Sequence, residues 1–439
     1  MSKIYINKLG VKFESFDHSD ESFFESFTQH FCEVYESNNP RQITYFCDFY
    51  ESYFKNQKDF LVFRELWACL HLLKGNHKDF QNPYLDAIEA VYSDIFNCED
   101  SLVRSGFISG THALTVALFA VLRPGDTLLA VTGKPYDTLE EVIGIRGENN
   151  GSLREFGVNY KEVPLKDNKP DYEAIRNAID ENVKAVAIQR SRGYSLRPTL
   201  SVAEIGEIAK LVHEKSNAVV MVDNCYGELV EKIEPTEVGA DLMAGSLIKN
   251  AGGSIARTGG YIAGKKELVE LCAYRATTPG LGKEVGATLG QSRDLFMGIF
   301  SAPHVVGEAL KTAVYVSALF NLLGFDTTPE THETRHDIIQ AVKLCDDKKL
   351  IAFCQGLQKG APVDSFVTPM PWDMPGYDNK VIMAAGAFTL GSSIELSADA
   401  PLREPYSVWM QGGLNFHSSK IAVLYAAAEV MKIMEESEK

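Results

Sequence analysis

The sequence lacks most features that mark secreted, membrane-bound or metal-binding proteins. Its eight cysteines are scattered and include no Cys-x2-Cys pair, so neither a disulfide framework nor a zinc site is predicted. Residues 1–20 contain no apolar core of a secretory signal. No run approaches the ~20 apolar residues of a transmembrane helix. We therefore expect a reduced, cytoplasmic protein with no bound metal and no membrane partner.

Positive charge is also scarce. The chain carries 43 lysines and arginines against 59 aspartates and glutamates, a formal net charge of −16. Nucleic acid would repel such a chain, so we expect no nucleic-acid partner. The 439 residues suit two or three structural domains, and 45% hydrophobic with 23% charged residues is typical of an ordinary soluble enzyme.

Two familiar phosphate-binding signatures are missing as well. The spacing Gly-x4-Gly-Lys-Ser/Thr does not occur, and no Gly-x-Gly-x2-Gly fingerprint follows a first strand. What the chain has instead, from about residue 86, is an alternation of helical and strand patterns, which predicts an α/β fold with a mostly parallel sheet covered on both faces. The expected helices are 84–96, 113–122, 135–144, 171–182 and 199–216, the last capped by Ser201, and the expected strands are 127–133, 158–165, 183–191, 217–223, 241–248 and 259–264.

Three parts are expected along the chain. Residues 1–85 are rich in aromatic and acidic residues with helical spacing, and predict a helical segment that packs on the body or on a partner subunit. Residues 86–320 form the large α/β domain. Residues 321–439, which end in a long amphipathic helix, predict a smaller α+β domain that closes over the first.

The clearest chemical signal is a pair of residues, Asp223 and Lys249. Asp223 ends an apolar run, and Lys249 follows 26 positions later in a glycine-rich turn. Many pyridoxal phosphate enzymes use such a pair: the carboxylate keeps the pyridine nitrogen protonated, and the lysine amine forms an imine with the aldehyde. The alternatives are a helix-capping aspartate and a solvated lysine.

A glycine turn, Ser-Gly-Thr-His at 109–112, precedes an apolar helix. The backbone N–H groups of Gly110, Thr111 and His112, at the positive end of the helix dipole, could bind the phosphate. The alternative is an ordinary turn capped by Ser109. Ser246, three residues before the lysine, is a further candidate for the phosphate.

Other candidates lie elsewhere in the chain. The ring of Tyr136 could stack on a flat cofactor, and the guanidinium of Arg403 could bind a substrate carboxylate through two hydrogen bonds. Gln189, Arg190 and Arg192 are all candidates for the partner of the ring oxygen O3′, and the sequence does not choose between them.

From about residue 101 to its end, the chain resembles the aluminium-resistance or methionine γ-lyase-like family. These proteins are fold-type-I pyridoxal phosphate enzymes related to cystathionine β- and γ-lyases. The matching stretches include TGKPYDTLEEVIGIRGE, IQRSRGYSLRP, VDNCYGEL, EPTEVGADLMAGSLIKN and ELSADAPLREPY. Together with similar blocks they cover about three quarters of the chain.

The resemblance implies a large domain with a mostly parallel seven-stranded sheet, pyridoxal 5′-phosphate as cofactor, and a homodimer or homotetramer. It implies Lys249 as the imine-forming lysine, Asp223 as the partner of the pyridine nitrogen, Tyr136 as the stacking ring, Gly110, Thr111 and Ser246 as phosphate contacts, and Arg403 as the carboxylate anchor.

The predicted reaction is elimination from an amino acid. The amine of Lys249 removes the Cα proton, and Tyr136 donates a proton to the leaving group. Whether the leaving group departs from Cβ or Cγ stays open, as does a halide in place of a thiolate. Two alternatives also stay open: an aminotransferase or decarboxylase on the same fold, and a non-catalytic binding protein.

Two departures from the family pattern stand out. Residues 77–90 replace a glycine- and tyrosine-rich segment that reaches the neighbouring subunit's cofactor, and Tyr84 is the one tyrosine left there. Ala251 and Arg257 stand where the family tends to have prolines. These changes favour a substrate that differs from that of the usual family member.

Overall fold

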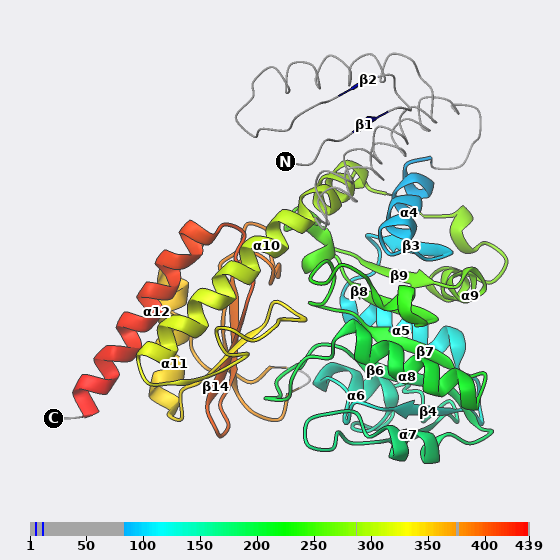
Figure 1. Cartoon of the computed structure of the whole chain (residues 1–439), viewed down its shortest axis with the longest axis horizontal. Helices are drawn as coiled ribbons and strands as arrows, with labels where there is room; N and C mark the ends of the chain where they lie inside the picture. Colours follow the sequence, from blue (N-terminus) through cyan, green and yellow to red (C-terminus); the bar gives the residue numbers. More distant parts are fainter. Residues whose placement is uncertain (1–4, 7–10, 13–82, 287, 375–376, 438–439) are drawn as a thin grey trace.

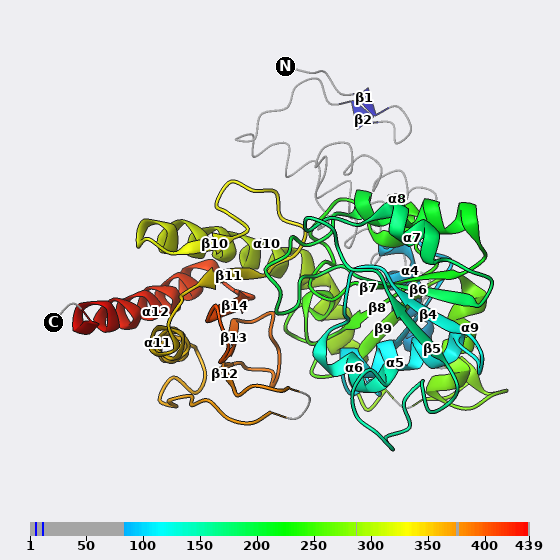
Figure 2. The same ribbon diagram turned by 90° about the horizontal axis from the view of Figure 1, so that it is seen from below.

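The computed structural model describes residues 5–6, 11–12, 83–286, 288–374 and 377–437. Most of this part of the chain is built around two sheets, one of seven strands and one of five. The two sheets and their helices lie side by side (Figures 1 and 2). The short strands β1 (Tyr5–Ile6) and β2 (Val11–Lys12) pair antiparallel, and the predicted N-terminal helices lie outside the described residues.

The seven-stranded sheet is mostly parallel, as predicted. In spatial order its strands are β3 (Asp100–Arg104), β9 (Gly260–Gly264), β8 (Leu242–Ser246), β7 (Val219–Asp223), β6 (Val183–Gln189), β4 (Thr127–Ala130) and β5 (Asn159–Glu162). Strand β9 runs antiparallel to both of its neighbours. The sequence analysis missed β3, because a five-residue edge strand with two charged residues has little apolar pattern to show.

Helices cover both faces of this sheet, which is why its central strands are apolar throughout. Along β7, Val220 and Val222 point into the core on one face, and Met221 points into the core on the other. The first face is covered by α4 (Pro83–Ile95), α7 (Tyr172–Ala178) and α8 (Val202–Lys215), and the second by α5 (Gly110–Val121), α6 (Asp137–Ile143) and α9 (Lys266–Ala276).

Two predicted caps begin their helices. Ser201 Oγ accepts a hydrogen bond from Glu204 N (3.2 Å), and Glu204 Oε2 accepts one from Ser201 N (2.9 Å), so α8 begins with a reciprocal capping box. Ser109 caps α5 by accepting from His112 N at 3.1 Å. Caps of this kind stabilise a helix by about 1 kcal/mol.

The five-stranded sheet is antiparallel throughout and confirms the predicted α+β character of the C-terminal part. In spatial order its strands are β10 (Asp326–Thr328), β11 (Gln340–Lys343), β14 (Ser407–Gln411), β13 (Ser397–Pro401) and β12 (Val381–Ala384). Helices α11 (Asp347–Lys359) and α12 (Phe416–Ser437) pack together against it (Figure 1). Short 3-10 helices are η1 (Pro235–Val238), η2 (Asn250–Gly252) and η3 (Gly282–Glu284).

A long helix, α10 (Ser292–Leu322), connects the two sheets. Its first half contributes Ile299 and Ala302 to the large core, and its second half contributes Val316 and Phe320 to the core under the small sheet. The predicted boundary at residue 320 therefore falls within its last turn. By length and composition α10 is the one helix in the described ranges that could cross a membrane, but half of its apolar stretch is buried inside the protein.

Candidate active site

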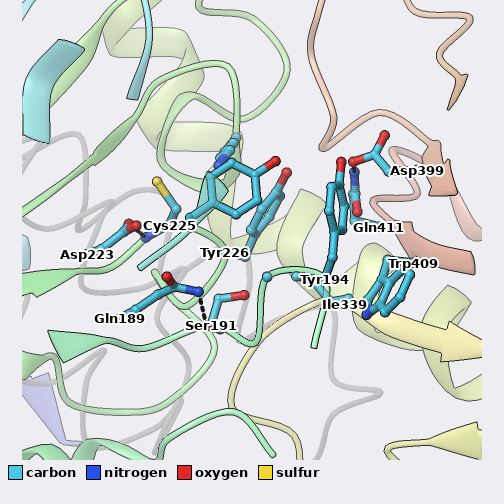
Figure 3. A pocket seen from close by; sticks show the side chains of 13 residues that line it. Gln189, Ser191, Tyr194, Asp223, Cys225, Tyr226, Ile339, Asp399, Trp409 and Gln411 are labelled. Atoms are coloured by element: carbon cyan, nitrogen blue, oxygen red, sulfur yellow. Dashed lines mark hydrogen bonds between the residues drawn. The ribbon is translucent and has the colours of Figure 1, made fainter. Parts of the chain in front are cut away.

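A pocket lies where the two sheets meet (Figure 3). Strands β6, β7 and β8 end beside it, and open α/β sheets bind ligands beyond the carboxyl ends of their strands. Its lining residues are Tyr136, Gln189, Ser191, Gly193, Tyr194, Asp223, Cys225, Tyr226, Lys249, Ile339, Asp399, Trp409 and Gln411.

The structure brings Asp223 and Lys249 to this one cavity. Asp223 is the last residue of β7, and Lys249 follows the end of β8 by three residues. The two strands are parallel neighbours, with Asp223 in register with Ala244. Cys225 N donates a hydrogen bond to Asp223 Oδ1 (3.1 Å), and Lys249 Nζ lies 4.0 Å from the centroid of the Tyr226 ring.

Asp223 and Lys249 each shift the pKa of the other toward its charged form. Burial raises the pKa of Asp223, while Lys249 and the hydrogen bond from Cys225 oppose that rise. Burial also disfavours the charged form of Lys249, but the acidic groups around it, Cys225, Tyr226, Asp223 and Glu228, together hold its pKa above the usual value. An amine and a carboxyl group, both half-buried, thus face one cavity, and each favours the charged form of the other.

The N-terminus of α5 meets the end of β8 at the edge of the site. A β-carbon added at Gly110 would lie 3.1 Å from Ser246 Cβ and 3.4 Å from Cys225 Sγ. This closeness explains why a residue without a side chain stands there. Ser246 is buried, and its Oγ accepts a hydrogen bond from Ile248 N (3.3 Å).

The other two residues of the glycine turn are partly engaged within the protein. Thr111 Oγ1 is 2.8 Å from Thr138 Oγ1. His112 donates its backbone N–H to Ser109 Oγ, and its Nδ1 accepts from Ile108 N at 3.3 Å. The N–H groups of Gly110 and Thr111 stand in the first turn, where a helix offers them no partner.

Tyr136 lines the cavity from the start of α6. Its hydroxyl lies 2.5 Å from the hydroxyl of Tyr377, and its ring meets the ring of Tyr194 edge-on, with centroids 5.7 Å apart. Burial, reinforced by Tyr377 and Asp399, raises the pKa of Tyr136 well above its usual value. The hydroxyl therefore keeps its proton at neutral pH and can act as a donor.

Of the three candidates for the O3′ partner, Gln189 lines the cavity. Arg190 is fully buried and donates to Asn224 Oδ1 (2.7 Å) and Glu231 Oε1 (2.9 Å). Arg192 donates to the carbonyl oxygen of Thr328 (3.0 Å). Neither arginine is among the lining residues, so the geometry favours Gln189.

Arg403 is not brought into the cavity. Its side chain is exposed in the loop after β13, near enough to Asp137 to oppose the burial that raises the pKa of that carboxyl. Arg257 is also exposed, with its Nε 3.3 Å from Asp294 Oδ2. Ala251 is fully buried, and none of these residues lines the cavity.

Two histidines in the described ranges have a spacing that can bind a metal. His332 and His336 have the spacing His-x3-His, which is a zinc-binding spacing when it occurs on a helix. Here the pair lies in an irregular loop, and His336 Nδ1 is 3.0 Å from Glu231 Oε1. Within the ranges that the structure describes, no group of three or more His, Cys, Asp or Glu side chains is placed to hold a metal ion.

Sequence reasoning missed the wall of the cavity opposite Asp223. It consists of Tyr194, Ile339, Asp399, Trp409 and Gln411. Most of these residues come from the small sheet, whose short strands gave no clear pattern. One signal was present: Asp399 lies in the stretch ELSADAPLREPY, four residues before Arg403, which drew the attention instead.

The donor set fits pyridoxal phosphate. An amine that can bond to an aldehyde, a carboxylate for a pyridine nitrogen and an aromatic ring line the cavity, with a helix N-terminus at its edge. One buried polar atom of the lining, Gln189 Oε1, has no hydrogen-bond partner in the described part of the chain. Such atoms are rare in proteins unless a ligand or water completes them.

Known proteins agree with this assignment. A sequence model described as methionine gamma-lyase matches residues 63–431. The chain is 52% identical over 350 residues to the "Uncharacterized protein YnbB" of Bacillus subtilis, covering 79% of this chain and 83% of that one. It is 29% identical over 227 residues to the L-methionine gamma-lyase of Pseudomonas putida, about half of each chain (51% and 50%).

A solved structure is similar over nearly the whole chain. The carbon–sulfur lyase involved in aluminium resistance from Clostridium novyi superposes with a TM-score of 0.80 at 44% identity, covering 95% of this chain and 100% of that one. The geometry and these similarities agree: the chain belongs to the methionine gamma-lyase family, whose members are pyridoxal-phosphate-dependent carbon–sulfur lyases.

Proposed function

We propose that the protein eliminates a thiol from a sulfur-containing L-amino acid, leaving a keto acid and ammonia. The observation that carries this proposal is the convergence of Lys249 and Asp223 on one cavity from the ends of neighbouring strands. Family membership favours a carbon–sulfur lyase over the aminotransferase, decarboxylase and non-catalytic alternatives. A halide as leaving group is retained as a second substrate class for the test.

Seven residues are proposed to hold the cofactor. Lys249 binds it covalently, Asp223 pairs with the pyridine nitrogen, and the ring of Tyr136 stacks on it. Gly110 and Thr111 donate backbone N–H groups to the phosphate. Ser246 Oγ and His112 are also proposed to contact the phosphate. When bound, pyridoxal phosphate supplies an electron sink for the charge that develops at Cα.

The protein's own groups then move the protons. Lys249 Nζ takes the proton from Cα, and the hydroxyl of Tyr136 gives one to the departing sulfur. Tyr136 is proposed for this step because its side chain lines the cavity beside Lys249 and its hydroxyl carries a proton at neutral pH. Gln189 is proposed to hydrogen-bond the ring oxygen, because its Oε1 has no partner in the described residues and can accept from a protonated O3′.

Arg403 is retained as a proposed contact of the substrate carboxylate. Its exposed position near Asp137 makes it a residue at the approach to Tyr136 rather than a lining group. Replacement by methionine keeps most of the side-chain length and removes the charge. If the proposal is right, Arg403→Met raises KM about tenfold with little change in kcat, whereas an unchanged KM would remove Arg403 from the site.

The direct test is a substrate screen with the purified holoenzyme. Thioethers of cysteine and homocysteine and halogen-bearing amino acids are incubated separately, and keto acid, ammonia and the organic product are measured. Pyruvate with ammonia identifies β-elimination, and 2-oxobutanoate with ammonia identifies γ-elimination. Transfer of the amino group to an added keto acid, without ammonia, would replace this proposal with transamination.

We also propose a homodimer or homotetramer in the cytoplasm. Several large apolar side chains are mostly exposed on the described surface: Ile108, Leu289, Phe366 and Leu390. The cysteines Cys98, Cys225, Cys272, Cys345 and Cys354 are unpaired, which suits a reducing compartment. Light scattering of the purified protein tests the assembly, and a monomer at micromolar concentration would contradict it.

A further inference from the structure

One carboxylate in the cavity has no place in the proposed reaction. Asp399, on β13, lines the wall opposite Asp223 (Figure 3). Gln411 Nε2 donates to Asp399 Oδ2 (3.0 Å) and to Ser397 Oγ (3.0 Å), so the carboxylate is held in a fixed orientation. Among the lysines, arginines and histidines that the structure describes, none forms an ion pair with Asp399.

Aromatic rings surround this carboxylate. The rings of Tyr194 and Trp409 have centroids 5.4 Å apart, and Tyr136 lies against the other side of Tyr194. Aromatic faces beside a carboxylate are the arrangement by which proteins bind ammonium groups.

The charges of the lining side chains lead to the same ligand. Besides tyrosine and cysteine, the ionisable lining residues are Lys249, Asp223 and Asp399. In the proposed function, Lys249 serves the cofactor and the Cα proton, and Asp223 serves the pyridine nitrogen. Asp399 is then a half-buried carboxylate with no ion-pair partner among the described residues, and a cationic ligand in the cavity would pair with it. Burial accordingly raises its pKa, although Gln411, Tyr194 and Lys249 oppose the rise.

We propose that Asp399, with Tyr194 and Trp409, binds an ammonium group carried by the leaving-group side of the substrate. This inference rests on the proposed lyase function and narrows its substrates to thioethers whose sulfur bears an aminoalkyl chain. For a cysteine thioether, the Cβ–S bond breaks with its electron pair going to sulfur, and the sulfur gains a proton. Water then completes the conversion of the remaining fragment to pyruvate and ammonium.

The kinetic test compares two thioethers of equal length. S-(2-aminoethyl)-L-cysteine ends in an ammonium group, and S-propyl-L-cysteine ends in a methyl group. The wild-type holoenzyme is expected to favour the aminoethyl compound about tenfold or more in kcat/KM, the usual effect of a hydrogen bond to a charged group. Asp399→Asn is expected to bring that ratio close to one. Asp326→Asn makes the same charge change at an exposed position of the same sheet and should keep the ratio.

A binding test separates this inference from the reaction. L-Lysine and L-2-aminoheptanoic acid have the same lengths as the two thioethers but no leaving group, and calorimetry gives their affinities for the holoenzyme. If lysine binds more tightly than its uncharged analogue and this preference disappears in Asp399→Asn, the ammonium site is supported, whether or not the thioethers are cleaved. If neither thioether is cleaved, the lyase proposal fails and the ammonium site stands. Cleavage of both thioethers at similar rates, with no dependence on Asp399, overturns the ammonium site and leaves the lyase standing.

Discussion

Asp223 and Lys249 line one cavity although 26 residues separate them in the sequence. The reason is the pairing of β7 with β8, since parallel neighbours end at the same edge of the sheet. The carboxylate closes one strand, and the amine follows the turn after the other. The fold thus positions an acid and an amine for a cofactor that needs both.

Asp223→Asn removes the charge opposite Lys249 while keeping the shape of the side chain. We expect kcat to fall about 30-fold or more, because an amide cannot keep the pyridine nitrogen protonated as the carboxylate does, and losing a hydrogen bond to a charged group costs roughly 2 kcal/mol. The cofactor should still attach to Lys249. Asp180→Asn, at an exposed position, is the control. Turnover of Asp223→Asn at the wild-type rate would show that Asp223 has no role at the ring.

Gly110→Ala tests the phosphate corner. The added β-carbon would lie 3.1 Å from Ser246 Cβ, so one of these backbones must shift by a few tenths of an ångström. We expect cofactor affinity, measured by titrating the cofactor-free protein, to weaken about tenfold. Gly106→Ala is the matched control, because a β-carbon there meets no heavy atom within 4 Å. Equal affinities for the two variants would contradict the assignment.

Tyr136→Phe separates stacking from proton donation. The ring stays in place, while the hydroxyl that lies beside Tyr377 is lost. We expect kcat to fall about 100-fold, within the usual range for a general acid, with the cofactor still bound. Tyr377→Phe removes the neighbouring hydroxyl and should have a much smaller effect. If Tyr136→Phe keeps the wild-type kcat, the ring has only a stacking role.

Glu228 gives the protein a pH-dependent stability. It is fully buried, its Oε1 accepts from Tyr261 Oη (2.9 Å), and burial raises its pKa from 4.5 to about 8 against the opposing hydrogen bonds and Lys249. Between those values the folded state keeps a proton that the unfolded state loses, so rising pH lowers the stability across this window.

Glu228→Gln cannot ionise and should escape that loss. Relative to wild type, the free energy of unfolding of the variant is expected to rise from about pH 5 to about pH 8 and to level off above. Urea unfolding at several pH values gives the comparison. A difference between the two proteins that is the same at every pH would show that Glu228 is already charged in the folded state.

Much of the large sheet could be predicted because its strands are locally distinctive. The apolar run that ends at Asp223 and the capped helix that begins after Ser201 each carry their own signal. Helix α10 was missed, although it is the longest in the described ranges. It packs against two cores and carries an internal Pro303, so it shows neither a single apolar face nor a clear boundary.

The site was predictable where it depends on strand ends and not where it depends on packing between the sheets. Lys249 and Asp223 follow apolar strands directly. Asp399 reaches the cavity because β13 pairs with β14 in one register, with Asp399 opposite Trp409, and because the small sheet lies beside the large one. Neither the register of β13 with β14 nor the placement of the two sheets can be predicted from the local sequence. Arg403 is chemically suited to a substrate carboxylate, but the fold places it on the surface and not in the cavity lining.

The covalent attachment at Lys249 is the central claim, and it can be measured directly. The holoenzyme is reduced with borohydride, which fixes a lysine-bound cofactor, and its peptides are mapped by mass spectrometry. We predict one pyridoxyl adduct on the peptide that contains Lys249, and none there in Lys249→Ala. An unmodified Lys249 peptide from protein saturated with pyridoxal phosphate would contradict the account.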